Sequence, residues 1–341
     1  MLNRILLSLF LLSLPQSLPS TELNSRPLAI TNVTLIDATG KPPQPGMGEA
    51  KKLSIPVAGH APESVSAWEV AERGQRSIEH VSPVLPGDAG IMLACSSQES
   101  QLRAEMFELK RLAEDKSADR QQLRQRQRQL QQQMAETRDQ RKCADLFRLF
   151  VKNNVHAVPT QIWSKRFAPL TADDLPENEA LKLAPQSLLT RWVSRRQQVI
   201  KASAAGDFAF RRLLFEKSRE LVTFMHRARV SLLAGTDAMD GFVLPGLGLH
   251  EELALMVEAG LTPMEALQTA TRNPAAFLGQ SNSLGTIEKG KIADMVLLDA
   301  DPLQNIANTR KIHAVIIGGK LITQTQRQEM LAKIESFARQ H

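Results

Sequence analysis

Three short apolar runs in this chain end on a side chain that can hold a metal ion or carry a proton. One run ends at Asp237, directly after Gly-Thr, and two earlier runs, residues 55–60 and 75–80, end on His60 and His80. Short apolar runs of this kind are typical of buried parallel strands, whose carboxyl ends carry the chemistry of α/β folds. Two imidazoles and one carboxylate at three strand ends form a set that can hold a divalent metal ion.

Helical periodicity separates these strands. Residues 62–74 begin with Pro-Glu-Ser, continue with spaced apolar residues and close at Gly74, which predicts a helix between the first two strands. Strand, helix and strand with short connections are the unit of a parallel sheet. Most of residues 170–229 is expected to be helical. Further helices are expected over residues 248–259 and 263–272, a sheet-like run over 155–160, and strands over 28–37, 293–299 and 312–317.

Residues 95–145 differ in kind from the rest of the chain. Two apolar stripes at helical spacing are separated by a turn and a helix cap, and the other faces carry almost only Arg, Gln, Glu and Lys. We expect an antiparallel helical hairpin with coiled-coil character, inserted into the main fold. It is either a solvated insertion that packs on itself, which we favour, or an arm or lid that binds a partner.

The only two cysteines, Cys95 and Cys143, flank this hairpin at its base. In an exported protein they are reasonable disulfide partners, and two separate buried thiols are the alternative. Neither has the CxxC spacing of a redox or zinc motif.

The first 20 residues have the order of a secretory signal peptide: one early positive charge at Arg4, an apolar core, and then helix breakers and small residues. The core is about half as long as the roughly 20 apolar residues of a membrane span. We therefore expect export, to a periplasm or to the outside, and no stable membrane span once the signal is removed.

Composition narrows the choice of partner. The 341 residues are 43% apolar and 23% charged, which is typical of a globular protein. The net charge of +6 suits nucleic acid, but only 4% of the residues are aromatic and tyrosine is absent, so few side chains can stack on bases. We expect no nucleic acid among the partners.

The motifs resemble those of the amidohydrolase superfamily, in its imidazolonepropionase-like and Xaa-Pro dipeptidase-like branch. The resemblance covers most of the chain outside the hairpin. It is carried by residues 28–37 with the Pro-Gly loop that follows, 57–61, 77–80, 233–238, 251–253, 259–267 and 290–296.

This resemblance implies an α/β fold, a TIM-type (β/α)8 barrel that holds one or two divalent ions, and zinc is our first choice of metal. It also implies a small β-sandwich formed by both chain ends, residues 28–47 and 284–322. His60 and His80 would be the metal-binding histidines of strands five and six, and Asp237 the acid of strand eight. In the family mechanism that acid takes a proton from metal-bound water, which attacks a carbonyl group.

The resemblance further implies a small amide substrate, either a cyclic amide or a dipeptide that ends in proline. His250 and Glu251 follow a Gly-Leu-Gly loop beyond the strand-eight acid, and they either face the substrate or simply begin a helix. His156 either reaches the substrate or is a buried strand histidine, and we favour the latter.

The chain departs from the family in what it lacks. Family members carry a His-x-His pair on the first barrel strand, and many carry a carbamylated lysine on the fourth; no His-x-His occurs in this sequence. We therefore expect residues 48–283 to form an incomplete barrel that holds strands five to eight only. Fewer ligands should weaken metal binding, and the open barrel should need a cover such as a second copy of the chain. Two functions stay open: a metal-dependent hydrolase of C–N bonds, or an inactive binding or assembly protein that acts through the hairpin.

Overall fold

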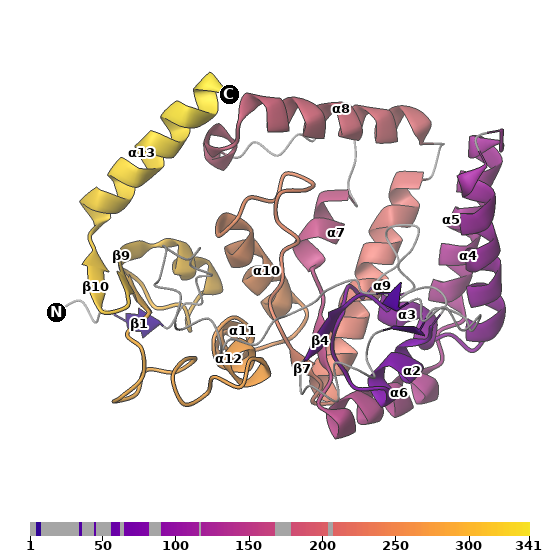
Figure 1. Cartoon of the computed structure of the whole chain (residues 1–341), viewed down its shortest axis with the longest axis horizontal. Helices are drawn as coiled ribbons and strands as arrows, with labels where there is room; N and C mark the ends of the chain where they lie inside the picture. Colours follow the sequence, from indigo (N-terminus) through magenta and orange to yellow (C-terminus); the bar gives the residue numbers. More distant parts are fainter. Residues whose placement is uncertain are drawn as a thin grey trace. The chain divides into compact units, whose positions relative to one another are not determined.

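The computed structural model in Figure 1 describes residues 56–61, 65–81, 90–115, 117–167, 179–203 and 207–341, and the backbone of 5–7, 34–35 and 44–45. Most of the predicted signal peptide and most of residues 28–47 lie outside these described residues. The chain divides into two compact units. We call Leu11–Val158 with Arg227–Ser231 the hairpin unit, and Met1–Phe10, Pro159–His226 and Leu232–His341 the C-terminal unit.

A four-stranded sheet organises the hairpin unit. Strands β4 (Val57–Gly59), β5 (Gln75–Glu79) and β6 (His156–Val158) are parallel neighbours, and β7 (Ser231–Leu232) follows β6 in the order. Helix α2 (Ala67–Glu72) connects β4 to β5, so the strand–helix–strand unit predicted from the sequence is present. It begins where the Ser66 hydroxyl accepts a hydrogen bond from the Trp68 amide, at 3.0 Å, and a glycine with φ of 95° follows it.

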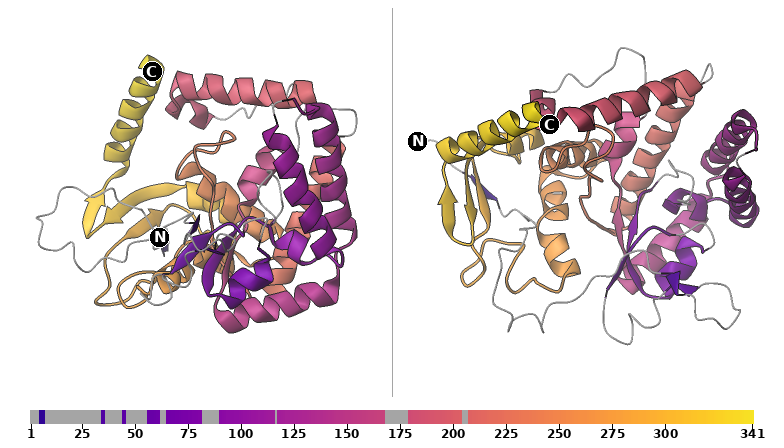
Figure 2. Two further views of the ribbon diagram at one scale, coloured as in Figure 1. Left: turned by 45° about the vertical axis from the view of Figure 1, so that its right-hand side comes forward. Right: turned by 45° about the horizontal axis from the view of Figure 1, so that its top comes forward.

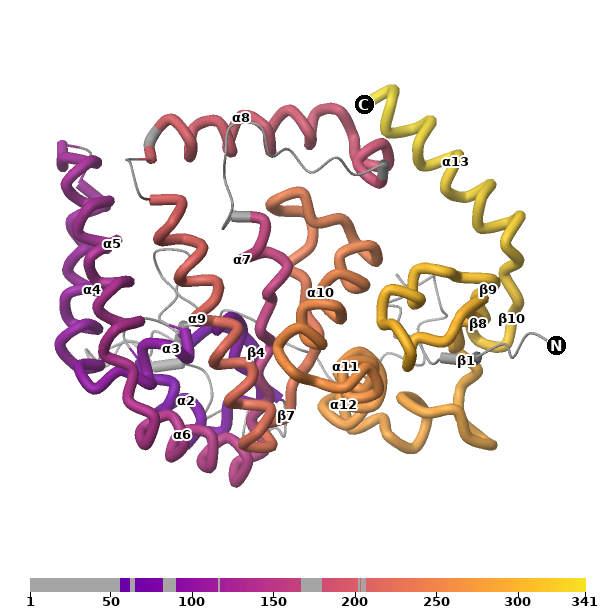
Figure 3. The backbone as a smooth tube through the Cα atoms, turned by 180° about the vertical axis from the view of Figure 1, so that it is seen from behind, coloured from indigo at the N-terminus to yellow at the C-terminus, as the bar shows by residue number. Residues whose placement is uncertain are grey.

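Helices α4 (Glu99–Glu114) and α5 (Arg120–Glu136) lie side by side in Figure 3, where the sequence predicts a hairpin. The Asp119 carboxylate caps α5 by accepting hydrogen bonds from two backbone amides. Between the helices, apolar side chains pack into a small cluster of their own that also reaches α3 (Gly90–Ala94). A disulfide joins Cys95 to Cys143 of α6 (Gln140–Asn153), with 4.7 Å between their Cα atoms. The cluster comprises Leu93, Leu102, Met106, Leu130 and Met134.

The C-terminal unit is mainly helical. Its helices are α7 (Gln161–Phe167), α8 (Gln186–Ala202), α9 (Asp207–Arg227), α10 (Leu247–Glu258), α11 (Pro263–Thr269), α12 (Arg272–Phe277) and α13 (Gln324–Gln340), with 3-10 turns η2 (Glu179–Leu183) and η3 (Ile306–Arg310). Helix α11 begins as the sequence predicts, with Thr262 as cap, a proline in the first turn and a capping box to Glu265. None of the described helices is long and apolar enough to cross a membrane.

A second sheet belongs to this unit. Strands β8 (Met295–Leu298), β9 (Ile312–Ile317) and β10 (Lys320–Ile322) form the antiparallel ribbon seen in gold in Figure 2, and β1 (Ile5–Leu7) pairs with β8. Strand β1 falls inside the segment predicted to be a signal peptide. In the hairpin unit, β2 (Thr34–Leu35) and β3 (Gln44–Pro45) pair only with each other among the described strands. The β-sandwich predicted for residues 28–47 and 284–322 stays a prediction.

Candidate active site

The two strand-end histidines of the hairpin unit lie next to each other. His60 follows β4 and His80 follows β5, and their ring centroids are 4.8 Å apart at an interplanar angle of 64°. The imidazole of His60 is exposed and that of His80 half-buried. Because neighbouring parallel strands end at the same edge of a sheet, the strand register itself brings the two rings together.

The backbone at His80 is strained. Its φ is 62°, in the left-handed region that residues other than glycine adopt uncommonly, although histidine is enriched there. Its amide still donates a hydrogen bond to the carbonyl oxygen of Val158 on β6, at 2.9 Å. Such strain costs on the order of 1–3 kcal/mol and persists where the surrounding structure enforces it, often at functional sites.

A buried glutamine holds the end of β4 in place. The Gln75 side-chain amide donates hydrogen bonds to the carbonyl oxygens of Gly59, at 2.7 Å, and of Ser77, at 2.8 Å. Because Gly59 directly precedes His60, this amide fixes the backbone from which the first imidazole projects. The sequence shows Gln75 only as a polar residue at a strand start, so its role was missed.

Asp237 belongs to the C-terminal unit, on the loop that follows β7. Its carboxylate is exposed and its φ is 49°, again in the left-handed region. The start of this loop is anchored twice: the Ala234 amide donates to the carbonyl oxygen of Thr269, and the Asn273 side chain donates to that of Leu232, both at 3.0 Å. The anchors come from α11 and α12, and neither was identified from the sequence.

Helix α10 packs closely against the same loop at Gly248. A Cβ atom added at Gly248 would lie 2.6 Å from Val243 Cγ1 and 3.6 Å from Thr236 Cβ. Both contacts are side chains of the loop that carries Asp237. The glycine therefore lets the helix approach the loop more closely than any larger residue would.

The residues fit a metal ion only in part. Two imidazoles within one unit can supply two nitrogen ligands, whereas a catalytic zinc ion usually takes three protein ligands and a water molecule. Among the described residues, no three His, Cys, Asp or Glu side chains gather into a group that could hold a metal ion. The described structure thus brings together two of the three predicted ligands, His60 and His80.

Of the other candidate histidines, His156 is buried and His250 is half-buried. His156 begins β6 opposite Ser77, so it lies below the edge at which β5 ends. It is 3% exposed, and burial, helped by the charge of Arg76, lowers its pKa to about 4. Its surroundings are those of a buried strand histidine.

His250 and Glu251 lie on α10 and bind other parts of the C-terminal unit. The Nδ1 atom of His250 is 2.9 Å from the Thr309 hydroxyl, and burial, with a contribution from Arg310, lowers its pKa to about 4. The Glu251 carboxylate forms ion pairs with Arg166, at 2.5 Å, and with Arg310, at 3.4 Å. These contacts hold both side chains in place.

Glu252, the next residue, is fully buried. Its carboxylate accepts hydrogen bonds from the backbone amides of Gln161, at 3.0 Å, and Ile162, at 2.7 Å, and so caps α7. Burial raises its pKa to about 7 although both hydrogen bonds act to lower it. The sequence held a signal for this burial, because Glu252 shares the apolar face of α10 with Leu249, Leu253 and Met256.

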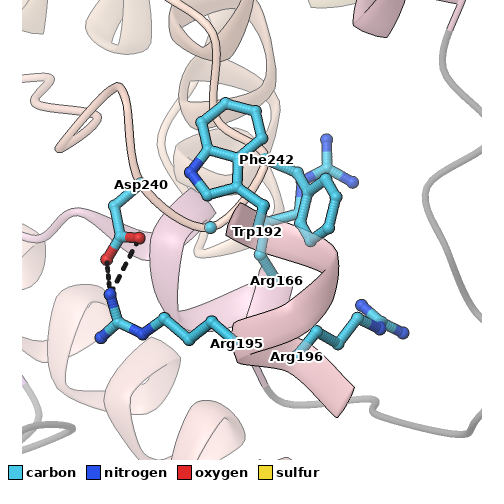
Figure 4. Close-up of a pocket in the computed structure, with 7 residues that line it drawn as sticks. Arg166, Trp192, Arg195, Arg196, Asp240 and Phe242 are labelled. Atoms are coloured by element: carbon cyan, nitrogen blue, oxygen red, sulfur yellow. Dashed lines mark hydrogen bonds and ion pairs between the residues drawn. The ribbon is translucent and has the colours of Figure 1, made fainter. Parts of the chain in front are cut away.

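A pocket of about 260 Å³, counting the space open to solvent, lies in the C-terminal unit between α7, α8 and the loop after β7 (Figure 4). We call it the arginine pocket because three of its seven lining residues are arginines. Arg195 reaches across to Asp240, while Arg196 leaves α8 on the other side. The lining residues are Arg166, Trp192, Arg195, Arg196, Asp240, Gly241 and Phe242.

The sequence profile of the amidohydrolase family matches residues 46–322, which is most of the chain. The chain belongs to the amidohydrolase family. The resemblance to this superfamily, in its imidazolonepropionase-like and Xaa-Pro dipeptidase-like branch, is confirmed.

Known amidohydrolases resemble parts of this chain. A 5-methylthioadenosine/S-adenosylhomocysteine deaminase from Syntrophomonas wolfei is 35% identical over 97 residues, which are 23% of this chain and 22% of the deaminase. An imidazolonepropionase from Shouchella clausii is 30% identical over 113 residues, which are 30% of this chain and 25% of that protein. The solved structure of bottromycin amidohydrolase has a TM-score of 0.56 at 18% identity and shows a shared α/β fold.

The coverage of these relatives is partial. The alignment with bottromycin amidohydrolase covers 86% of this chain but 55% of that structure. The chain thus spans about half the length of the solved relative, and the matches cover a quarter or less of each curated relative.

Proposed function

We propose that this amidohydrolase-family chain is a metal-dependent hydrolase of C–N bonds in small molecules, and that it uses a zinc ion. The observation that carries the proposal is the pair of strand-end imidazoles, His60 and His80, 4.8 Å apart on adjacent parallel strands. The family match includes both strands and the loop of Asp237. Substrates would be cyclic amides or dipeptides that end in proline.

Each residue has a distinct role in this proposal. His60 and His80 hold the metal through ring nitrogens, and Gln75 positions the backbone before the first of them. A bound zinc ion supplies Lewis acidity, which lowers the pKa of water to about 7 and polarises the substrate carbonyl. Asp237 completes the ligand set, accepts the proton of the attacking water and passes it to the leaving nitrogen. Its exposed carboxylate is open to such a transfer.

We further infer that β4, β5, β6 and β7 are barrel strands five to eight of the family fold. Their order in one sheet and the histidines that follow the first two support this assignment. A barrel of four strands leaves sheet edges to be covered, and a second copy of this chain is our candidate. Light scattering on the purified protein tests this point, and a stable monomer would argue against it.

Metal content and turnover test the hydrolase proposal together. We expect the purified protein to hold about one zinc ion per chain and to hydrolyse members of a panel of Xaa-Pro dipeptides and cyclic amides. Asp237→Asn should lower the turnover rate by at least about 10²-fold, the range of lost acid–base catalysis. His60→Ala and His80→Ala should lose the metal, whereas His313→Gln, on β9 of the other unit, should keep metal and activity. Turnover that survives in Asp237→Asn would contradict the role of this acid.

A binding or assembly protein that acts through the hairpin is the second candidate. It is favoured by the missing His-x-His pair and by Phe107 on α4, whose side chain is 53% exposed. A metal-free protein that turns over no member of the panel would support this function instead of the first.

We also propose that the chain is exported after removal of residues 1–20. The order of charge, apolar core and small residues in that segment supports it. Intact-mass measurement of the protein recovered from a periplasmic fraction tests the cleavage. An unprocessed product that stays inside the cell would contradict it.

A further inference from the structure

Three residues other than glycine on the loop after β7 adopt left-handed backbone conformations. They are Asp237, with φ of 49°, Met239, with φ of 75°, and Phe242, with φ of 64°. In this region Cβ comes too close to a carbonyl oxygen, so glycine adopts it freely, Asp and Asn tolerate it, and other residues are strained. A strained residue persists where another interaction offsets its cost.

Two of these three residues have a reason for their conformation. Asp237 has the short polar side chain that tolerates the left-handed region. Phe242 is 6% exposed, and its ring centroid lies 5.3 Å from that of Trp192, so the burial of its ring offsets the strain. Figure 4 shows these two rings side by side.

Met239 has neither compensation. Its side chain is 50% exposed, so it adds little to the apolar core. Its amide donates a hydrogen bond to the carbonyl oxygen of Val243, at 2.9 Å, but a glycine at this position could donate the same bond without strain. The folded chain would therefore lose little with glycine at position 239, and the strained methionine points to a contact with a ligand.

The loop presents Met239 together with Asp237. These are the only exposed positions among residues 233–244, whose other members are buried or half-buried. The residue that follows, Asp240, is held in place by Arg195, whose Nη1 atom lies 3.1 Å from its carboxylate oxygens. A molecule that reaches the carboxylate of Asp237 thus meets an apolar side chain two residues further along an anchored loop.

We propose that Met239 determines substrate specificity by contacting an apolar group of the substrate. This inference rests on the proposed hydrolase function and narrows its substrates to amides that carry a large apolar group beside the C–N bond. In dipeptides that end in proline, this group is the side chain of the first residue, because the proline ring is common to all of them. Methionine suits such a contact, since its unbranched thioether side chain adapts to apolar groups of different shapes.

Unfolding in urea tests whether the fold itself needs this methionine. Met239→Gly should keep the urea midpoint close to that of the wild type, because relief of strain offsets the greater freedom of glycine in the unfolded chain. Phe242→Gly is the matched control: its backbone is also left-handed but its ring is buried, so it should unfold at a clearly lower urea concentration. A comparable drop in Met239→Gly would show that Met239 supports the fold, and would contradict the proposal.

Binding of two dipeptide analogues to the purified protein, in buffer that contains zinc, tests the contact. A methylene group replaces the carbonyl group of leucyl-proline and of glycyl-proline, so that neither analogue can be hydrolysed, and calorimetric titration gives the Kd of each. The wild type should bind the leucyl analogue about tenfold more tightly, as expected for an apolar side chain that becomes partly buried. Equal binding of the two analogues, or no binding of either, would overturn the proposal.

Variants then assign this preference to Met239. In Met239→Gly the Kd values of the two analogues should come within about twofold of each other, and Met239→Leu should restore the tenfold difference, since leucine also offers an apolar side chain. Met264→Ala removes a methionine that is 48% exposed on α11 and should leave the difference unchanged. A preference that survives in Met239→Gly, or is lost equally in Met264→Ala, refutes the assignment.

Turnover of the unmodified dipeptides decides the hydrolase function separately. Hydrolysis by the wild type, with an unchanged leucine preference in Met239→Gly, would refute the role of Met239 and leave the hydrolase proposal intact. A leucine preference in binding that depends on Met239, without turnover of any dipeptide, would support the contact and count against the hydrolase.

Discussion

In the hairpin unit and in the C-terminal unit, a buried titratable side chain at the start of a strand or helix has a pKa far from its ordinary value. His156 starts β6 in the hairpin unit, and Glu252 caps α7 in the C-terminal unit. Burial shifts both towards the neutral form: the pKa of His156 falls to about 4 and that of Glu252 rises to about 7. Since one group is neutral without its proton and the other with it, acid should destabilise the first unit and stabilise the second.

The two units also present their candidate catalytic groups differently. His60 and His80 stand at the ends of hydrogen-bonded parallel strands, and their proximity follows from the sheet. Asp237 stands on a loop whose shape depends on packing against α10 and on hydrogen bonds from α11 and α12. The positions of the two imidazoles therefore depend on backbone hydrogen bonds between strands, whereas the position of Asp237 depends on packing and on hydrogen bonds from neighbouring helices.

Reduction of the disulfide should produce the largest difference in stability between the two units. Cys95 and Cys143 both lie in the hairpin unit and close a loop of 48 residues, which contributes about 3–4 kcal/mol to its stability in the chain-entropy description. Dithiothreitol, or Cys95→Ser with Cys143→Ser, should therefore lower the unfolding free energy of this unit by that amount. Urea unfolding followed by tryptophan fluorescence measures it.

The three tryptophans allow each unit to be followed alone. Trp68 reports on the hairpin unit, and Trp163 and Trp192 report on the C-terminal unit. A chain that keeps only Trp68 should lose stability on reduction, and a chain in which Trp68→Phe leaves the other two should not. Equal losses in both chains would mean that the units unfold together.

Glu252 should make the C-terminal unit less stable as the pH rises. Its folded pKa of about 7 exceeds its ordinary value of 4.5, so the folded state binds more protons between these values. The penalty appears above about pH 4.5, is complete above about pH 7, and is on the order of 3 kcal/mol. Urea unfolding from pH 5 to pH 8, read from Trp163 and Trp192, measures this slope.

Glu252→Gln should abolish that slope, since the amide keeps the shape but does not titrate. It should also cost about 1–2 kcal/mol at pH 5, because its nitrogen cannot accept one of the two backbone hydrogen bonds. Glu258→Gln, near the end of the same helix, is the matched control and should preserve the wild-type slope. A slope that survives in Glu252→Gln belongs to another group.

His156 should give the hairpin unit the opposite response to pH. Its folded pKa of about 4 lies below the ordinary 6.5, so the unfolded state takes up the proton first. The stability of this unit is therefore complete above about pH 6.5 and is lost as the pH falls towards 4, by on the order of 3 kcal/mol. Urea unfolding read from Trp68 should show this loss, and His156→Gln should remove it. Parallel pH profiles in the two units would refute the comparison.

The strand ends could be predicted from the sequence, because short apolar runs and glycines mark them. The runs that end at His60 and His80 gave β4 and β5, and the parallel register then placed the two rings together. Strands β8 and β9 and helix α10 follow the predicted pattern within two residues.

The side chains that hold the candidate site in place could not be predicted from the sequence, because their roles depend on partners distant in sequence. Gln75 and Glu252 act through backbone groups of other elements, and no local pattern names those partners. The arginine pocket lies between α8 and a loop more than 40 residues later in the chain. No local pattern in the sequence indicates that Arg195 and Asp240, which are 45 residues apart, form an ion pair. Helix α13 was missed, although its capping box at Thr323 and Gln326 is a local signal.

The smallest expected effect concerns the contact between α10 and the loop of Asp237. Gly248→Ala brings a methyl group to 2.6 Å from Val243 Cγ1, so either helix α10 or the loop must move. Overpacking of this kind lowers folding stability by about 1–3 kcal/mol. The better helix propensity of alanine offsets up to about 1 kcal/mol of this loss. We expect a net loss of about 1 kcal/mol in the C-terminal unit, measured by urea unfolding, and a larger fractional loss of turnover if the displaced loop moves Asp237.

A double-mutant cycle separates this clash from other effects. Val243→Ala removes the atom that the new methyl group meets, so Gly248→Ala should cost less in that background than in the wild type. The expected coupling is about 1 kcal/mol in favour of the double variant, because contacts of this kind couple by about 0.5–3 kcal/mol. Additive losses would show that the glycine is not required for the close approach, and the loop of Asp237 would then owe its conformation to the hydrogen bonds from Asn273 and Ala234 alone.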